Sequence, residues 1–306
     1  MPLQEKSLKE KLSGVFPPVM TPFFADGRID YAGLALNIEK MNRTDLGGYM
    51  PLGSNGEFRS LTDGEALEVV RLIAKKRGPG KTLMVGTGRE SAWATIEFTK
   101  KAAGAGAEFA SLLTPYYYAS KMTDAALTRF FAQVADASPI PVLIYCAPGF
   151  AGGLVISPGA VRELAAHPNI VGMKDTSKED IGGYVRAAEG AEFYVLAGSI
   201  SKFYYGLSVG AIGGVLSIAN YLPQECCEIQ RLFSVGKKEE ANALSEVLKS
   251  ITSRATGKYG VAGVKGAMEL LGYRGGEPRV PLLPLGPAEL EEVRGVLASE
   301  GFLKQP

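Results

Sequence analysis

Lys174 directly follows an apolar run, residues 170–173, instead of lying on a charged helix face. Removal from water destabilises the ammonium form of a lysine, so burial favours the neutral, nucleophilic amine. A neutral amine attacks ketones and forms a Schiff base, the covalent intermediate of a large class of lyases. The alternative interpretation is that Lys174 only marks the point where a strand reaches solvent. The other polar groups of the chain favour the first interpretation.

Further groups able to do chemistry follow other short apolar runs. They are Gly53-Ser54-Asn55-Gly56-Glu57, Thr114-Pro115-Tyr116-Tyr117-Tyr118, Tyr145-Cys146-Ala147-Pro148-Gly149, Lys174-Asp175-Thr176 and Gly198-Ser199. Hydroxyls can relay protons, and the backbone N–H groups of a glycine-flanked turn can hold a carboxylate. The set contains no cluster of metal ligands. It therefore favours covalent imine catalysis with no cofactor beyond the imine on Lys174.

Eight short β-prone runs alternate with segments of helical period, and this alternation must position the reactive groups. The runs are 14–20, 48–52, 82–86, 109–113, 141–145, 170–174, 193–197 and 212–217, and the helical segments are 30–41, 63–76, 91–105, 123–137, 158–166, 178–188, 201–208 and 223–233. Pro17 and Pro18 weaken the first strand. Continuous apolar strands in this order predict an α/β fold, a closed parallel (β/α)8 TIM barrel, in which residues after the strands meet at one mouth.

A doubly wound open sheet is the alternative architecture. It often carries a glycine-rich first turn, but the similar stretch at 86–91 lacks the third glycine and follows the third strand. Beyond Gly236 the pattern changes to three helical segments, 237–254, 261–271 and 287–300. We therefore expect a catalytic barrel over residues 1–235 and a three-helix C-terminal extension over 236–306.

The composition is that of a soluble globular enzyme, with 46% hydrophobic and 21% charged residues. With 33 basic and 32 acidic residues, no patch of net charge indicates nucleic acid or an anionic membrane, so we expect a small-molecule substrate. No apolar run approaches the length of a membrane span, and residues 1–12 lack the apolar core of a signal peptide. Three cysteines, two of them adjacent, indicate a reducing, cytoplasmic location. The single histidine, His167, is expected to be structural.

As a set, these motifs resemble the pyruvate-dependent class I aldolases that include dihydrodipicolinate synthase and N-acetylneuraminate lyase. The resemblance is carried by GSNGE at 53–57, TPYY at 114–117, Tyr145-x-x-Pro148 and GMKD at 172–175, and it runs from about Gly14 to the end of the chain. Within this family, the stretches 53–58, 138–142, 167–175 and 271–276 are most similar to 4-hydroxy-2-oxoglutarate aldolase, which forms pyruvate and glyoxylate. The resemblance implies a Schiff-base aldolase acting on pyruvate and a small aldehyde.

The resemblance also implies catalytic roles. Lys174 matches the Schiff-base lysine and Tyr145 the tyrosine that moves protons to and from the substrate. Ser54 matches a hydroxyl that links Tyr145 to a second tyrosine, here Tyr117, which in the synthases reaches in from a neighbouring subunit. Such a site needs a homo-oligomer, and the family implies a tetramer built as a dimer of dimers.

Other positions match contacts to the substrate. Ser54 and Asn55 correspond to the turn that binds the pyruvate carboxylate. Further substrate contacts correspond to Thr176, Gly198 and the backbone of Leu216.

Position 150 departs from the synthases, which place an arginine there to hold the carboxylate of the aldehyde substrate; this chain has Phe150. A phenyl ring cannot make that charge-assisted contact, so dihydrodipicolinate synthase is the less favoured activity. Thr176 and Ser199 remain candidates for holding a second carboxylate. A 2-keto-3-deoxy sugar acid aldolase or dehydratase would also fit the motifs. A non-catalytic metabolite-binding relative is a remote alternative, because such a relative usually lacks the lysine or the tyrosine, and this chain has both.

Several nearby residues have simpler structural interpretations. Tyr116 and Tyr118 suit an aromatic cluster at a subunit interface. Cys146 suits a small buried hydrophobe. Asp175 follows Lys174 on a strand and should therefore point away from it, toward the outside of the barrel.

Overall fold

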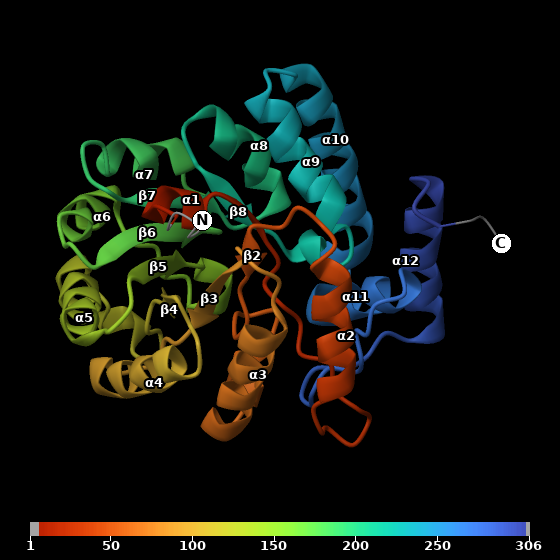
Figure 1. Ribbon diagram of the computed structural model, residues 1–306, viewed down its shortest axis with the longest axis horizontal. Coiled ribbons are helices and arrows are strands. Elements are labelled where there is room, and N and C mark those ends of the chain that lie inside the picture. Colours follow the sequence, from red (N-terminus) through yellow and green to blue (C-terminus); the bar gives the residue numbers. More distant parts are fainter. Residues whose placement is uncertain (1–5, 304–306) are drawn as a thin grey trace, which may run out of the picture.

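Each predicted β-prone run forms a strand, and the eight strands pair in parallel in the order β1-β8-β7-β6-β5-β4-β3-β2. In this computed structural model, which describes residues 6–303, the strands lie at the centre of a ring of helices (Figure 1). Their bounds are β1 (Gly14–Phe16), β2 (Gly48–Tyr49), β3 (Thr82–Gly86), β4 (Phe109–Leu113), β5 (Val142–Cys146), β6 (Ile170–Asp175), β7 (Tyr194–Ala197) and β8 (Gly213–Val215). The predicted TIM barrel is confirmed.

The barrel closes between β1 and β2 through backbone hydrogen bonds that lie mostly beyond the short ladders. Gly47 N–H donates to the carbonyl of Val15 at 2.9 Å, and Met50 N–H donates to that of Pro17 at 3.0 Å. The strand predicted over 14–20 ends at Phe16 because Pro17 and Pro18 have no N–H to donate to a ladder.

Eight helices follow the strands at the predicted places. They are α2 (Tyr31–Met41), α3 (Asp63–Lys76), α4 (Ala92–Gly104), α5 (Asp124–Ala137), α6 (Pro158–Ala165), α7 (Ile181–Ala187), α8 (Ile200–Ser208) and α9 (Pro223–Ser234). Polar caps fix most starts; Thr62 and Glu65, for example, form a reciprocal capping box at the start of α3. The segment predicted from Lys178 begins later, at Ile181, because the Asp180 side chain caps the helix there.

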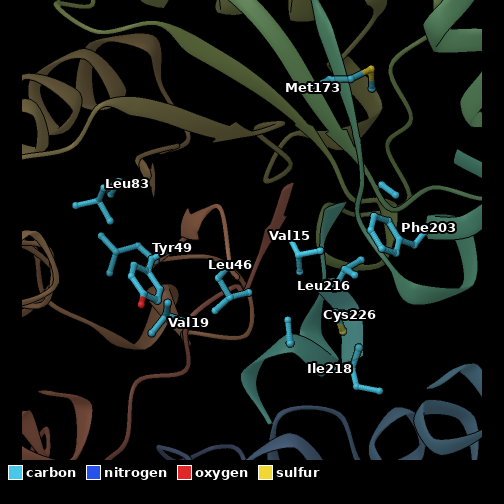
Figure 2. Close-up of a cluster of buried hydrophobic side chains, with 14 of the residues drawn as sticks. Val15, Val19, Leu46, Tyr49, Leu83, Met173, Phe203, Leu216, Ile218 and Cys226 are labelled. Atoms are coloured by element: carbon cyan, nitrogen blue, oxygen red, sulfur yellow. The ribbon is translucent and has the colours of Figure 1, made fainter. Parts of the chain in front are cut away.

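Two layers of buried side chains hold the barrel. Between the strands and helices lies the larger cluster, part of which Figure 2 shows, including Tyr49, Met173 and Phe203. Inside the barrel, each strand or the residue after it supplies one buried side chain: Phe16, Met50, Met84, Phe109, Leu143, Val171, Leu196 and Val215. Leu12 of the short helix α1 (Leu8–Leu12), which the sequence analysis did not predict, is buried against this inner cluster. In barrels of this kind the active site lies at the other end, where the carboxyl ends of the strands meet.

Three further helices follow the barrel, as expected: α10 (Lys238–Ile251), α11 (Gly257–Leu270) and α12 (Pro287–Ser299), blue in Figure 1. The break predicted between residues 254 and 261 is narrower than expected. A π-helical turn, Thr252–Thr256, joins α10 to α11, and the helical path is interrupted at Gly260, whose φ of 56° suits glycine. Across residues 6–303, no helix combines the length and apolar character needed to cross a bilayer.

Candidate active site

Lys174 and Tyr145 lie opposite each other on neighbouring strands β6 and β5. Both side chains are only 4% exposed. The Nζ of Lys174 lies 4.0 Å from the centre of the Tyr145 ring and 3.9 Å from the Sδ of Met50. Lys174 therefore does not mark a point where the strand meets solvent, which removes the alternative interpretation of this residue.

A bulge in β6 determines that Lys174 points into the barrel. Val142 pairs with Ile170, but the next residue of β5, Leu143, pairs with Gly172, so Val171 is one extra residue on β6. A bulge reverses which face the following side chains occupy. Val171 lies in the inner cluster, and three residues later Lys174 also contacts the inner residue Met50.

Asp175 points the other way, as the alternation of strand side chains predicted. It is fully buried outside the barrel, forms an ion pair with Lys202 of α8, and accepts a hydrogen bond from the Ser177 N–H at 2.9 Å. This pair joins β6 to α8 and leaves the Lys174 amine without a carboxylate partner on its own strand.

The turn after β2 carries Ser54 and Asn55 beside the barrel mouth. The Ser54 hydroxyl is buried and has no hydrogen-bond partner among residues 6–303. Asn55 Nδ2 donates to the Ser217 hydroxyl at 2.5 Å, which ties this turn to the segment after β8. A buried hydroxyl without a partner is costly, so Ser54 is suited to receive a polar ligand.

Hydrogen bonds at Thr176, Gly198 and Leu216 connect the ends of neighbouring strands: β6 to β5, β7 to β6 and β8 to β1. Thr176 donates both its N–H, at 2.9 Å, and its hydroxyl, at 3.1 Å, to the Cys146 carbonyl. Gly198 N–H donates to the Asp175 carbonyl at 2.7 Å, and a Cβ at Gly198 would lie 2.2 Å from the Thr176 methyl. Leu216 N–H donates to the Phe16 carbonyl at 3.0 Å. These three positions lie at the same barrel mouth as Lys174.

Tyr117 is not buried beside Lys174 of its own chain. It is 76% exposed, and its ring packs edge-on against Tyr118 at 5.0 Å between centroids. The carboxylate of Glu90 accepts the N–H groups of both Tyr116 and Tyr117 at 2.9 Å, which fixes the backbone that presents these rings. The Tyr117 side chain thus points outward from its own chain.

Cys146 is fully buried, and burial raises the pKa of its thiol to about 11. A thiol with a raised pKa is rarely the reactive thiolate at neutral pH. Cys146 therefore behaves as the small core residue that the sequence indicated.

The sequence analysis missed one buried cation, Lys265 of α11. It is 1% exposed, and burial lowers the pKa of its amine to about 8. Its Nζ lies 2.8 Å from a carboxylate oxygen of Glu57 in the turn that carries Ser54. The signal that singled out Lys174, a lysine among apolar neighbours, was also present at Val264-Lys265.

Two cavities flank the mouth. One, of about 560 Å³, is bordered mainly by apolar groups and includes Ser54 and Phe150 in its wall. The other, of about 490 Å³, is rich in hydroxyls: Ser199, Ser201, Ser217, Thr252 and Ser253 line it with Lys249 and Lys258. Ser54 thus borders the first cavity, and Ser199 and Ser217 border the second.

Known proteins resemble this chain over nearly its whole length. Residues 11–300 match the model of the dihydrodipicolinate synthetase family. A 4-hydroxy-tetrahydrodipicolinate synthase from Methanoculleus marisnigri is 32% identical, covering 94% of this chain and 99% of its own. A probable mitochondrial 4-hydroxy-2-oxoglutarate aldolase from Emericella nidulans is 34% identical over 88% of each chain. Among solved structures, a prophage protein of the dihydrodipicolinic acid synthase family from E. coli K12, in complex with pyruvate, superimposes with a TM-score of 0.89 at 29% identity, covering 95% of this chain and 99% of its own.

Proposed function

The chain belongs to the dihydrodipicolinate synthetase family of lyases, and from that membership we propose that it is a class I aldolase in which Lys174 forms an imine with a 2-oxo acid. One observation carries the proposal: the buried Lys174 amine lies against Tyr145 on the neighbouring strand. A buried amine favours the neutral nucleophile, and an adjacent phenol can exchange protons with the bound substrate.

Cleavage then needs only the groups of this chain and water. The Lys174 amine attacks the 2-oxo carbon, and water leaves to give the imine. Tyr145 takes the proton of the 4-hydroxyl as the C3–C4 bond breaks; the aldehyde departs, and the bonding electrons move toward the imine nitrogen as an enamine. Protonation of C3 and hydrolysis of the imine release pyruvate. Ser54 is proposed to pass the proton between Tyr145 and the partner's copy of Tyr117, and with Asn55 to hold the pyruvate carboxylate.

We propose 4-hydroxy-2-oxoglutarate as the substrate, split into pyruvate and glyoxylate. The sequence motifs favour it, and a relative from Emericella nidulans carries the name of that activity. The glyoxylate carboxylate needs a hydrogen-bond donor, and the phenyl ring of Phe150 offers none. The Thr176 hydroxyl already donates to the Cys146 carbonyl, whereas the Ser199 and Ser201 hydroxyls share one hydrogen bond at 2.8 Å, which leaves one hydroxyl proton free. Ser199 is therefore the better candidate, with Gly198 and the Leu216 backbone lining the same approach.

The second candidate substrate is aspartate semialdehyde, since several relatives are named 4-hydroxy-tetrahydrodipicolinate synthase. Phe150 argues against it, because a phenyl ring cannot hold the carboxylate of that aldehyde. A 2-keto-3-deoxy sugar acid is a third candidate, favoured by the hydroxyl-rich cavity beside Ser199. We also propose that the enzyme acts in the cytoplasm as a homotetramer built from dimers, because the outward position of Tyr117 suits exchange between subunits.

The first experiment measures pyruvate release from 4-hydroxy-2-oxoglutarate with a coupled dehydrogenase, using Lys174→Ala as the blank. The proposal expects release that depends on Lys174, and a covalent pyruvate adduct by intact mass after borohydride reduction of the wild type alone. Absence of the adduct from folded wild-type protein would overturn the imine mechanism. An adduct without release would retain the mechanism and reject this substrate.

A further inference from the structure

The apolar cavity adjoins the smaller cavity that contains the catalytic tyrosine. A small inner cavity beside Lys174 is lined by Met50, Tyr145, Leu113 and Phe58. Leu113 and Phe58 also line the outer cavity of about 560 Å³, so the two share a wall. An aldehyde that reacts at the imine beside Tyr145 therefore lies next to an apolar recess, on the side of Leu113 and Phe58.

This recess is much larger than glyoxylate requires. Its apolar lining comprises Phe58, Leu113, Phe150, Val261, Ala262, Leu282 and Leu283, with the ring of Tyr259. Sites of about 300–1,000 Å³ with mostly apolar walls are typical of pockets that bind drug-sized ligands. Leu283 is 74% exposed and Phe150 54% exposed, so apolar surface is available at the entrance for a ligand to cover.

The charged residues that line the recess already have partners. Glu57 is paired with Lys265 and accepts the Arg279 N–H at 2.8 Å. Arg59 bonds to Glu90 at 2.7 Å, and its guanidinium lies over the Phe58 ring at 4.7 Å. Among the described residues in this lining, Arg59 is the sole cation, and it is held at the rim by Glu90. Ser54 also lines the recess, but its hydroxyl is assigned to the pyruvate carboxylate. The rest of the recess therefore favours an uncharged aldehyde over an anionic one.

We propose that this enzyme also condenses pyruvate with uncharged aldehydes that carry an apolar aryl or alkyl group, and that the group occupies the recess beside Phe150. The inference rests on the proposed Lys174 imine. The nucleophilic carbon of the pyruvate enamine attacks the aldehyde carbon and forms the new C–C bond. The C=O π electrons move to oxygen, which takes a proton from Tyr145; water then hydrolyses the iminium, giving a 4-hydroxy-2-oxo acid and free Lys174. No oxidant or reductant is needed.

Two aromatic aldehydes, one neutral and one carrying a carboxylate, test the proposal. Pyruvate is incubated with benzaldehyde or with 4-carboxybenzaldehyde, and the 4-hydroxy-2-oxo acid product is quantified by mass spectrometry. We expect benzaldehyde to react at least about tenfold faster, because a buried carboxylate without a partner costs binding energy that a phenyl ring does not. Equal rates, or no benzaldehyde product from enzyme that condenses glyoxylate, would overturn the proposal.

A variant and a matched control locate the binding. Leu283→Ser removes apolar surface from the recess and should lower kcat/KM for benzaldehyde by about five- to tenfold, because a bound phenyl ring would then cover less apolar surface. Leu36→Ser makes the same change at another exposed leucine, on α2, which does not line the recess, and it should leave the rate unchanged. An equal loss in both variants would reject the recess as the binding place.

Failure of this inference can be told apart from failure of the aldolase mechanism. Lys174→Ala cannot form the imine, but its recess is intact, so it should still bind benzyl alcohol in ligand-observed NMR, and Leu283→Ser should weaken that binding. Binding without a pyruvate imine in the wild type would reject the mechanism and the condensation with it. If the wild type forms the pyruvate imine and condenses glyoxylate but does not bind benzyl alcohol, only the proposed role of the recess is rejected.

Discussion

A carboxylate oxygen of Glu57 lies 2.8 Å from the Nζ of Lys265, and both side chains are almost fully buried. Glu57 belongs to the turn after β2, and Lys265 lies on α11, more than two hundred residues later. The same ammonium donates to the carbonyls of Thr21 at 2.8 Å and Glu277 at 2.7 Å, so it joins the turn after β2 to two further segments. The C-terminal helices thus hold the barrel at its catalytic mouth.

This ion pair fixes the turn that presents Ser54 and Asn55. Glu57 adopts a left-handed backbone, with φ of 53°, and its N–H donates to the Ser54 carbonyl at 3.1 Å. A non-glycine residue in that conformation is strained and needs outside support. Lys265 supplies that support, which makes it a positioning residue for the proposed carboxylate site.

Lys265→Met should destabilise the fold by about 3–5 kcal/mol, because it leaves the Glu57 carboxylate buried without its partner. Chemical denaturation at pH 7 measures this loss. Glu57→Gln/Lys265→Met, which removes both charges, should recover part of it. A double variant as unstable as the sum of the two single variants would contradict coupling between these residues.

The Lys265→Met variant should also show whether Lys265 positions the turn at Ser54 or changes the reactivity of Lys174. If the turn moves, the pyruvate concentration needed for half-maximal imine formation should rise about tenfold in Lys265→Met, while saturating pyruvate still gives the Lys174 adduct. Borohydride trapping followed by intact mass provides the titration. Lys238→Met, at the exposed start of α10, serves as the control for loss of a lysine. Unchanged half-saturation in folded Lys265→Met would show that the pair supports the fold and not the turn.

Stability should depend on pH through Lys265. Burial lowers the pKa of its amine to about 8, while the unfolded chain binds that proton up to its ordinary pKa of 10.5. Between these values the unfolded state carries more protons, so the contribution of this group to the free energy of unfolding rises with pH. Glu57, Glu277 and Arg279 are the charged groups that act on it. The difference in unfolding free energy between wild type and Lys265→Met should therefore widen from pH 8 to about 10; a constant difference would contradict the lowered pKa.

Phe150→Arg should raise kcat/KM for condensation of pyruvate with aspartate semialdehyde, by about tenfold or more. The new guanidinium would supply the charge-assisted contact that the phenyl ring lacks, and such contacts are worth about 1.5–3 kcal/mol. Phe150→Leu keeps the site apolar and is the matched control. Efficient use of aspartate semialdehyde by the wild type would show that Phe150 does not exclude the synthase activity.

Hybrid oligomers should test the role of Tyr117. Lys174→Ala and Tyr117→Ala should each be inactive or nearly so, but a mixed oligomer contains one site with both Lys174 and a partner's Tyr117. Denaturing and refolding the two variants together should restore up to about a quarter of wild-type activity per site, the random-mixing expectation for one intact site in every second dimer. Tyr118→Ala, which removes the neighbouring exposed ring, is the control. No recovery from mixtures that form oligomers would place the Tyr117 function elsewhere.

The sequence alone determined most of the fold. Continuous apolar runs separated by capped helical segments specify parallel strands and their covering helices, and strands such as 82–86 and 109–113 appear with the predicted bounds. Since the carboxyl ends of parallel barrel strands share one mouth, the sequence also brought Lys174, Tyr145 and Ser54 to the same end of the molecule.

Tertiary structure decided the rest, because orientation and long-range pairing are not local properties. The extra residue Val171 turns Lys174 inward, and no local pattern announced that bulge. Lys265 meets Glu57 only because α11 folds back across the mouth, and the outward position of Tyr117 follows from how Glu90 holds its backbone. The sequence thus supplied the reactive groups and their shared location, while packing between distant segments set their direction, burial and partners.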